Sequence, residues 1–220
     1  MLEIKHRKTH AVLVQFDCDS LEGRKMAGAR LRGADLAGVN LNGADLVNSD
    51  LREADLHDAI LTGALLNGAY LDGANLVHAD LSGADLTDAK LDHAELQDAI
   101  LRKANLRYAQ LRDAILCNAD LSGADLSMAD LRADLRDAKL IRADLRAADL
   151  SGANLKGADL QEANLTGAKL TSAQLSGANT FGMIDVQGHK VTIKRPSSPE
   201  RKPSKPQKIA RPWWKFWAEA

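Results

Sequence analysis

The sequence predicts an all-β chain that coils around a narrow apolar axis, and three regularities in its 220 residues point to this fold. Leucine recurs at every fifth position from Leu31 to Leu131 and again from Leu135 to Leu175. The residue two before each of these leucines is alanine everywhere except at Val39 and Ser49. The residue two after the leucine is glycine twelve times and is never Val, Ile or Thr.

A repeat of five residues fits neither regular secondary structure. Five residues turn an α-helix by about 500°, which would spread the leucines over every face. In one long strand, the odd spacing would send successive leucines to opposite faces of a sheet. The repeat fits a three-residue extended piece, with Ala and Leu inward and Asp or Asn outward, followed by a two-residue corner. Glycine at the second corner position indicates a type II-like turn, whose second central residue needs positive φ.

The unit Ala-Asp/Asn-Leu-x-x, repeated from Leu31 to Asn179, resembles the pentapeptide-repeat family. This resemblance implies a right-handed quadrilateral parallel β-helix with four pentapeptides per coil, in which each coil stacks only on its neighbours. The five-residue register extends back to Phe16, so we expect the first coil to begin there. One corner residue is missing after Leu131, where only Arg132 is left, and we expect a tightened turn at that corner.

These observations divide the chain into four segments. Residues 1–15 are expected to form an N-terminal cap hairpin, because an open β-helix exposes unpaired strand edges. Residues 16–179 are the repeat β-helix, and residues 180–194 are expected to form a C-terminal cap hairpin that turns at Gln187 and Gly188. Residues 195–220 are basic and hold all five prolines, so we expect a disordered linker with an aromatic terminus.

Charge is segregated along the chain, although the whole sequence has a net charge of −1. Residues 29–100 hold 4 basic and 13 acidic residues, whereas residues 101–179 are nearly balanced. With four units per coil, residues twenty positions apart lie above one another. Asp35, Asp55 and Glu95 are therefore expected to stack as a candidate acidic face.

The C-terminus holds a second candidate site. Its candidate interaction residues are Trp213, Trp214, Lys215, Phe216 and Trp217, which include four of the eight aromatic residues of the chain. Tryptophan favours the membrane interface, and the basic linker before it is attracted to anionic headgroups. The alternatives are a short linear motif that inserts its aromatic rings into a groove of a partner protein, and a disordered end with no role.

Enzymatic chemistry is not expected, and we assign no catalytic, cofactor-binding or metal residue and no cofactor. A rod filled by Leu and Ala leaves no concave site, and the sequence has no phosphate-binding glycine loop. Cys18 and Cys117 lie far apart without CxxC spacing, which argues against a disulfide scaffold or a zinc cluster. The stacked column Asp58, His78 and Asp98 is expected to be a structural ion ladder rather than a metal site.

The expected function is that of a non-enzymatic β-helical interaction or scaffold module that binds an unknown protein partner. An anionic membrane surface is a second expected contact of the tail, and direct nucleic-acid binding is not expected. No apolar run is long enough for a membrane span, so the expected location is the cytoplasm, or the periphery of the membrane. The resemblance also implies an alternative, because some pentapeptide-repeat proteins mimic DNA and occupy DNA gyrase, which gives quinolone resistance. The acidic residues 29–100 fit this alternative, whereas the mixed charge of residues 101–179 weakens it.

Overall fold

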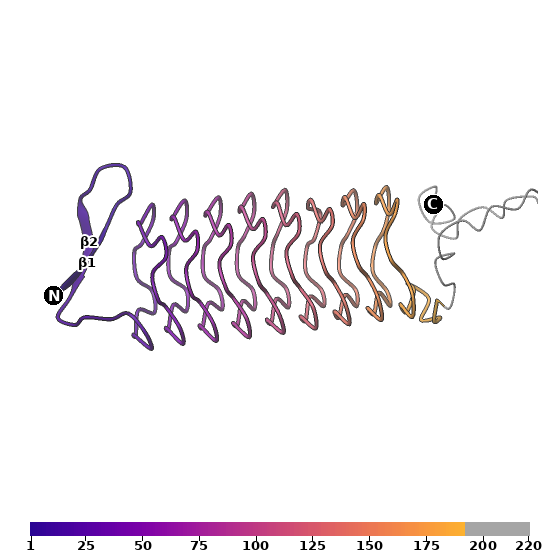
Figure 1. The fold of residues 1–220 in the computed structure, drawn as a ribbon, viewed down its shortest axis with the longest axis horizontal. Coiled ribbons are helices and arrows are strands. Elements are labelled where there is room, and N and C mark those ends of the chain that lie inside the picture. The colour runs from indigo at the N-terminus through magenta and orange to yellow at the C-terminus, as the bar shows by residue number, and fades with distance from the viewer. Residues whose placement is uncertain (192–220) are drawn as a thin grey trace, which may run out of the picture.

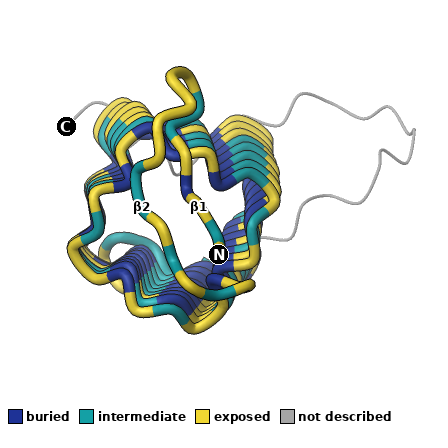
Figure 2. The backbone as a smooth tube through the Cα atoms, turned by 90° about the vertical axis from the view of Figure 1, so that its left-hand side faces the viewer, coloured by how far each residue is buried: buried dark blue, intermediate teal, exposed yellow. Residues whose placement is uncertain are grey.

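The structure, a computed structural model, describes residues 1–191. These residues form a short N-terminal hairpin followed by a rod of stacked coils (Figure 1). Viewed along the rod, the chain traces a four-sided outline (Figure 2). The described residues contain no helix, and hence none that could cross a membrane. The prediction of an all-β quadrilateral coil is confirmed.

Hydrogen bonds stack each coil on the next. Residues twenty positions apart pair in parallel, as in the bridges from Asp35 to Asp55 and from Asp55 to Asn75. Leu36 N–H donates to the Asp55 carbonyl at 2.8 Å, and Asp55 N–H donates back to the Ala34 carbonyl at 2.8 Å. Twenty residues are four pentapeptides, so each coil has the four sides that the sequence predicted. Each side pairs through one central residue, which leaves isolated bridges rather than long strands.

Leucine and alanine fill the axis of the rod. The inward leucines from Leu31 to Leu165 are at most 1% exposed, and the exposed fraction rises to 6% at Leu170 and 5% at Leu175 near the end. In Figure 2 the exposed residues lie at the corners of the outline, and buried and intermediate residues lie along the sides between them. Burial of a leucine side chain contributes about 1.5–3 kcal/mol, so this apolar column is the main source of stability.

The corners are four-residue turns. The alanine N–H donates to the leucine carbonyl three residues earlier, as in the 3.0 Å bond from Ala44 to Leu41. The second central residue of these turns has positive φ, which is 62° at Gly43 and 58° at Glu53. This geometry confirms the type II-like turn and explains why glycine is frequent and β-branched residues are absent at this position.

The missing corner residue is absorbed within one turn. Ala133 N–H donates to the Leu131 carbonyl at 2.8 Å, which closes a three-residue turn in place of a four-residue one. The bridge spacing drops to nineteen residues between Ile115 and Asp134 and returns to twenty between Asp134 and Asn154. The expected tightened turn is present, and the coils on either side of it remain paired.

An antiparallel hairpin covers the first coil. It consists of β1, Leu2–Lys5, and β2, Val12–Phe16, with Leu2 opposite Phe16. The Lys5 carbonyl accepts the Asp35 N–H at 2.7 Å, and Ile4 is only 2% exposed in the core. The hairpin therefore both pairs with the open edge of the first coil and closes its apolar axis.

A second reversal lies at the other end of the rod. Ile184 pairs in parallel with Asn164 and in antiparallel orientation with Lys190. Gly188, with φ of 87°, donates its N–H to the Asp185 carbonyl at 2.9 Å in the intervening turn. Residues 192–194 of the expected cap and the whole of segment 195–220 lie outside the described residues.

Candidate functional site

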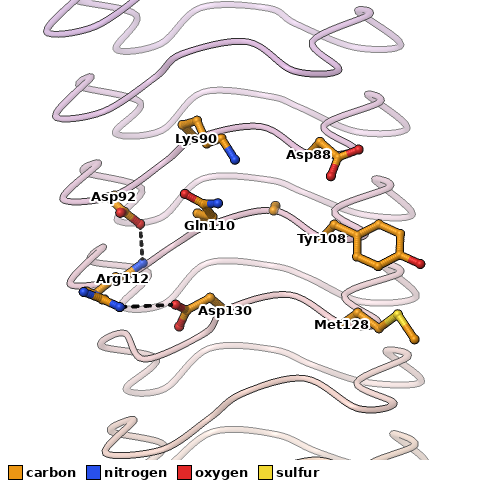
Figure 3. A pocket seen from close by; sticks show the side chains of 9 residues that line it. Asp88, Lys90, Asp92, Tyr108, Gln110, Arg112, Met128 and Asp130 are labelled. Carbon is orange, nitrogen blue, oxygen red and sulfur yellow. Dashed lines mark hydrogen bonds and ion pairs between the residues drawn. The ribbon is translucent and has the colours of Figure 1, made fainter.

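Two bulky side chains project from one corner of adjacent coils. Tyr108 and Met128 each occupy the second corner position, and their side chains lie one above the other (Figure 3). Tyr108 is 44% exposed and Met128 is 52% exposed. We call this pair the Tyr108–Met128 ridge. It presents an aromatic ring and a thioether to solvent where most coils present glycine or a small polar residue.

The backbone of the ridge is in a conformation that bulky residues rarely adopt. The φ angles are 60° at Tyr108 and 61° at Met128. Their turns are otherwise regular, because the N–H groups of Ala109 and Ala129 each donate to the carbonyl of the leucine three residues earlier, at 3.1 Å. The left-handed conformation costs a non-glycine residue about 1–2 kcal/mol. Positive φ is shared by second corner positions along the rod, including Asp88 and Ala147 in the same column, so the ridge differs from them in its exposed apolar surface at two consecutive positions.

A shallow surface pocket of about 600 Å³ lies beside the ridge. Its floor is one side of the rod, where Lys90, Gln110 and Asp130 pair in successive coils. Figure 3 shows the ridge on one edge of this side and Arg112 on the other. The lining residues are Asp88, Lys90, Asp92, Tyr108, Ala109, Gln110, Arg112, Met128 and Asp130. One edge of the pocket thus carries Tyr108 and Met128 next to Asp88, and the other edge is charged.

The charged edge is fixed by paired groups. Asp92 Oδ1 accepts the backbone N–H of Arg112 at 2.8 Å, and the Arg112 guanidinium lies 4.0 Å from Asp130. The Arg132 guanidinium donates to both oxygens of Asp130. This hydrogen bonding outweighs the effect of partial burial and lowers the pKa of Asp130 below its usual value. Asp130 is therefore ionised and paired at neutral pH, which makes it a poor general base.

The outer flank of the ridge carries an arginine. The guanidinium carbon of Arg107 lies 5.5 Å from the centroid of the Tyr108 ring, and its Nε lies 3.9 Å from Asp125. A cation–π contact at an exposed site contributes about 0.5–1 kcal/mol and restricts the ring. Tyr108 is consequently held in place as well as exposed.

The predicted acidic residues lie in one column but not as an unbroken face. Asp35 bridges to Asp55, Asp55 to Asn75, and Asn75 to Glu95. Asn75 separates two of the three carboxylates and donates its side-chain N–H to Asp55 at 3.0 Å. The role of this column as a recognition surface stays a prediction. The other candidate site, Trp213, Trp214, Lys215, Phe216 and Trp217, lies outside the described residues.

Histidines pair with carboxylates at several corners. The expected contact between His78 and Asp58 is present, with Nδ1 3.4 Å from Oδ1. A shorter pair, His57 Nδ1 to Asp55 Oδ1 at 2.8 Å, joins two residues of the same coil. The hydrogen bond and the charge of Asp55 raise the pKa of His57. Among residues 1–191, no group of three or more His, Cys, Asp or Glu side chains is placed to hold a metal ion.

Two features were missed at the sequence level. The Tyr108–Met128 ridge could have been found as a pair of bulky residues, twenty positions apart, at a turn position that requires positive φ. The outward Asp and Asn residues were predicted only to point away from the axis, but many also bind the backbone. Asp80 Oδ1, for example, accepts the Ser82 N–H at 2.9 Å. The frequent Asp or Asn two residues before the first corner residue was the available signal for such Asx turns.

Comparisons with known proteins agree with this architecture. The model of the family described as pentapeptide repeats matches overlapping segments that together span residues 20–179. Among solved structures, the chain is similar to HetL, a pentapeptide repeat protein involved in heterocyst differentiation regulation from the cyanobacterium Nostoc sp. strain PCC 7120. The identity to HetL is 38% over 76% of this chain and 78% of that one, with a TM-score of 0.35.

Two further solved structures are similar over part of their length. A pentapeptide repeat protein from the Arabidopsis thaliana thylakoid lumen is 38% identical over 47% of this chain and 63% of that one, with a TM-score of 0.24. Full-length QnrB1, a plasmid-mediated fluoroquinolone resistance protein, is 18% identical over 79% of this chain and 89% of that one, with a TM-score of 0.39. No curated protein matches the chain at a significant level.

The fold is a right-handed quadrilateral β-helix, and the chain belongs to the pentapeptide repeat family. Proteins of this family are generally structural or interaction modules rather than enzymes. Fold and family therefore place the chain in a class of structural or interaction modules.

Proposed function

We propose that this protein is a non-enzymatic scaffold that binds a protein partner through the Tyr108–Met128 ridge and the adjoining pocket. The observation that supports this proposal is the ridge itself, in which Tyr108 and Met128 expose apolar side chains in consecutive coils. Tyr, Met and Arg are enriched in protein interfaces, and Tyr and Arg in binding hot spots. The pocket supplies all three residue types within one side of the rod.

Binding fits the geometry better than catalysis does. The pocket is open and shallow, and the carboxylate of Asp130 is engaged by arginine. Charged residues held in this way set orientation and specificity in an interface, while the apolar edge supplies binding energy. This side of the rod would accept a protein surface that has an exposed apolar side chain surrounded by charged residues.

Affinity capture with the full chain tests the proposal. Tyr108→Gly with Met128→Gly should remove the ridge without unfolding the rod, because glycine suits the positive φ at both positions. Tyr70→Thr is the matched control, since Tyr70 is 45% exposed on the same side of the rod but outside the pocket. We expect one or more proteins to be recovered by the wild type and the control but lost with the double variant. Identical recovery by all three chains would refute the proposed face.

DNA mimicry remains the alternative function, and the contacts of the acidic residues weigh against it. Asp50 is paired with Arg52 at 2.7 Å, Glu53 with Arg32 at 2.5 Å, and Asp55 with His57. These pairs involve three of the 13 acidic residues in segment 29–100 and interrupt its negative surface locally. We expect the purified protein not to inhibit DNA supercoiling by gyrase, and inhibition that is lost on charge reversal at Asp35, Asp55 and Glu95 would favour the alternative.

Location and tail attachment are proposed from the sequence alone. We place the protein in the cytoplasm, or at the periphery of the membrane, with Lys215 and the neighbouring aromatic residues as an attachment segment. The described residues supply the scaffold for this arrangement, and the attachment segment lies beyond them.

A further inference from the structure

The Tyr108–Met128 ridge has an occupant of suitable chemistry in the same chain. We propose that the aromatic segment 212–217 docks in cis on the ridge and the pocket beside it. This inference rests on the proposed function of that face and adds its regulation: the chain covers its own binding surface until a partner displaces the segment.

The chemistry of the two surfaces is complementary. Segment 212–217 contains Pro, three Trp, one Phe and one Lys. Tryptophan and phenylalanine pack edge-to-face or offset on a tyrosine ring, and a methionine sulfur makes favourable contacts with aromatic rings. Tyr108 and Met128 supply both partners side by side. Among residues 1–191, an exposed aromatic residue and an exposed methionine stack in one corner column only at this ridge.

Charge also favours this pairing. Residues 192–220 hold 8 basic and 2 acidic residues. Within the pocket, Asp130 is paired with Arg112 and Arg132 and Asp92 accepts the Arg112 N–H, so the carboxylate that can attract a basic segment is that of Asp88. Asp88 lies in the same column as the ridge, one coil before Tyr108 (Figure 3). Its exposed carboxylate is placed to attract Lys215 or the basic residues that precede the aromatic segment.

The chain is long enough to make the contact. The ridge column passes from Met128 through Ala147 and Gly167 to the last described coil, a separation of about 14 Å at about 4.8 Å per coil. Twenty residues, 192–211, connect the described part to the aromatic segment. A flexible chain of that length has a root-mean-square span of about 25 Å, and a polyproline II chain spans about 60 Å. Either regime reaches the ridge, and the tether gives a high effective concentration.

Tryptophan fluorescence reports on this docking without added labels, because all three tryptophans of the protein lie in the segment. In the full chain at low concentration and without lipid, we expect blue-shifted emission and weak quenching by acrylamide. The double variant Tyr108→Gly with Met128→Gly should shift the emission to the red and raise acrylamide quenching several-fold. Tyr70→Thr should leave both quantities unchanged.

Oxidation of Met128 tests the docking independently of the tryptophans, because it reports on the exposure of the ridge. Its side chain is 52% exposed in the described structure, so an uncovered Met128 should react readily with hydrogen peroxide to the sulfoxide. We expect several-fold slower oxidation in the wild type than in the full-length variant Trp213→Ser, Trp214→Ser, Phe216→Ser and Trp217→Ser. Met1, which is 76% exposed and far from the ridge, serves as the internal control and should react equally in both chains.

Three results would overturn docking in cis. The first is solvent-like tryptophan emission in the wild type, and the second is emission unchanged by loss of the ridge. The third is a blue shift that grows with protein concentration, which would assign the contact to a second copy. If capture of partners depends on the ridge while the tryptophans prove exposed, the proposed function stands and only the self-docking fails.

Discussion

At the scale of single residues, many outward Asp and Asn side chains of the repeat form hydrogen bonds to the backbone of the corners. Asp80 Oδ1 accepts the Ser82 N–H at 2.9 Å, and Asp149 Oδ1 accepts the Ser151 N–H at 3.0 Å. Each such bond satisfies a donor at a corner and restricts the turn. Each hydrogen bond contributes about 0.5–1.5 kcal/mol net to stability. Because these bonds recur along the rod, the outward Asp and Asn residues have a structural role.

The His57–Asp55 pair gives a pH-dependent prediction. Because folding raises the pKa of His57, the pair contributes its full stabilisation below the unfolded value of about 6.5 and loses it as pH rises through the folded pKa. His57 is 44% exposed, so solvent should keep the contribution small. Titration of the ring protons by NMR should show His57 above its ordinary value, with a fall towards that value in Asp55→Asn. An unchanged midpoint in this variant would contradict the assignment.

A substitution at Ala147 measures the free-energy cost of positive φ without the effect of a bulky side chain. It lies in the ridge column with φ of 55°. Ala147→Gly should stabilise the rod by about 0.5–1 kcal/mol, because relief of the left-handed strain exceeds the entropy that glycine adds to the unfolded chain. Urea unfolding measures the change. Ala148→Gly, at the buried neighbour, should instead destabilise, and the same sign at both positions would refute the argument.

At the scale of the coil, the sequence specifies almost everything that the stack requires. The five-residue period predicted the four sides, the inward leucines and the turns with positive φ. It could not show contacts within a coil, such as His57 with Asp55, because stacking arguments compare only residues twenty positions apart. Nor could it show that Tyr108 and Met128 form the edge of a pocket. That depends on the rotamers of Lys90, Gln110 and Asp130, which the repeat leaves undetermined.

The stacked coil predicts unequal effects for equal substitutions. Leu96 has coils on both sides and is fully buried, whereas Leu175 is 5% exposed near the end of the rod. Leu96→Ala should lower the free energy of unfolding by about 2–5 kcal/mol, and Leu175→Ala by clearly less, because an end coil can relax or fray. Urea unfolding monitored by circular dichroism compares the two. Equal losses would contradict a one-dimensional stack.

At the scale of the whole molecule, the rod holds its hairpin, its acidic segment and the ridge at fixed positions along its length. The hairpin of β1 and β2 closes one end, the acidic residues 29–100 follow, and the ridge lies in the half of mixed charge. A partner that binds the ridge is therefore held at a fixed distance from both ends. Each coil contacts only its neighbours, so changes at the ridge should leave the capped end unaffected.

Site-specific photo-crosslinking in cells tests the proposed binding face most directly. The full chain would carry Tyr108→p-benzoyl-L-phenylalanine, with the same photoreactive residue at Tyr70 as the control on the same side of the rod. The proposed face predicts a crosslink from position 108 to a separate protein, apart from any link within the chain, and no such product from position 70. Identical products from the two positions, or no protein crosslinked at position 108, would contradict it.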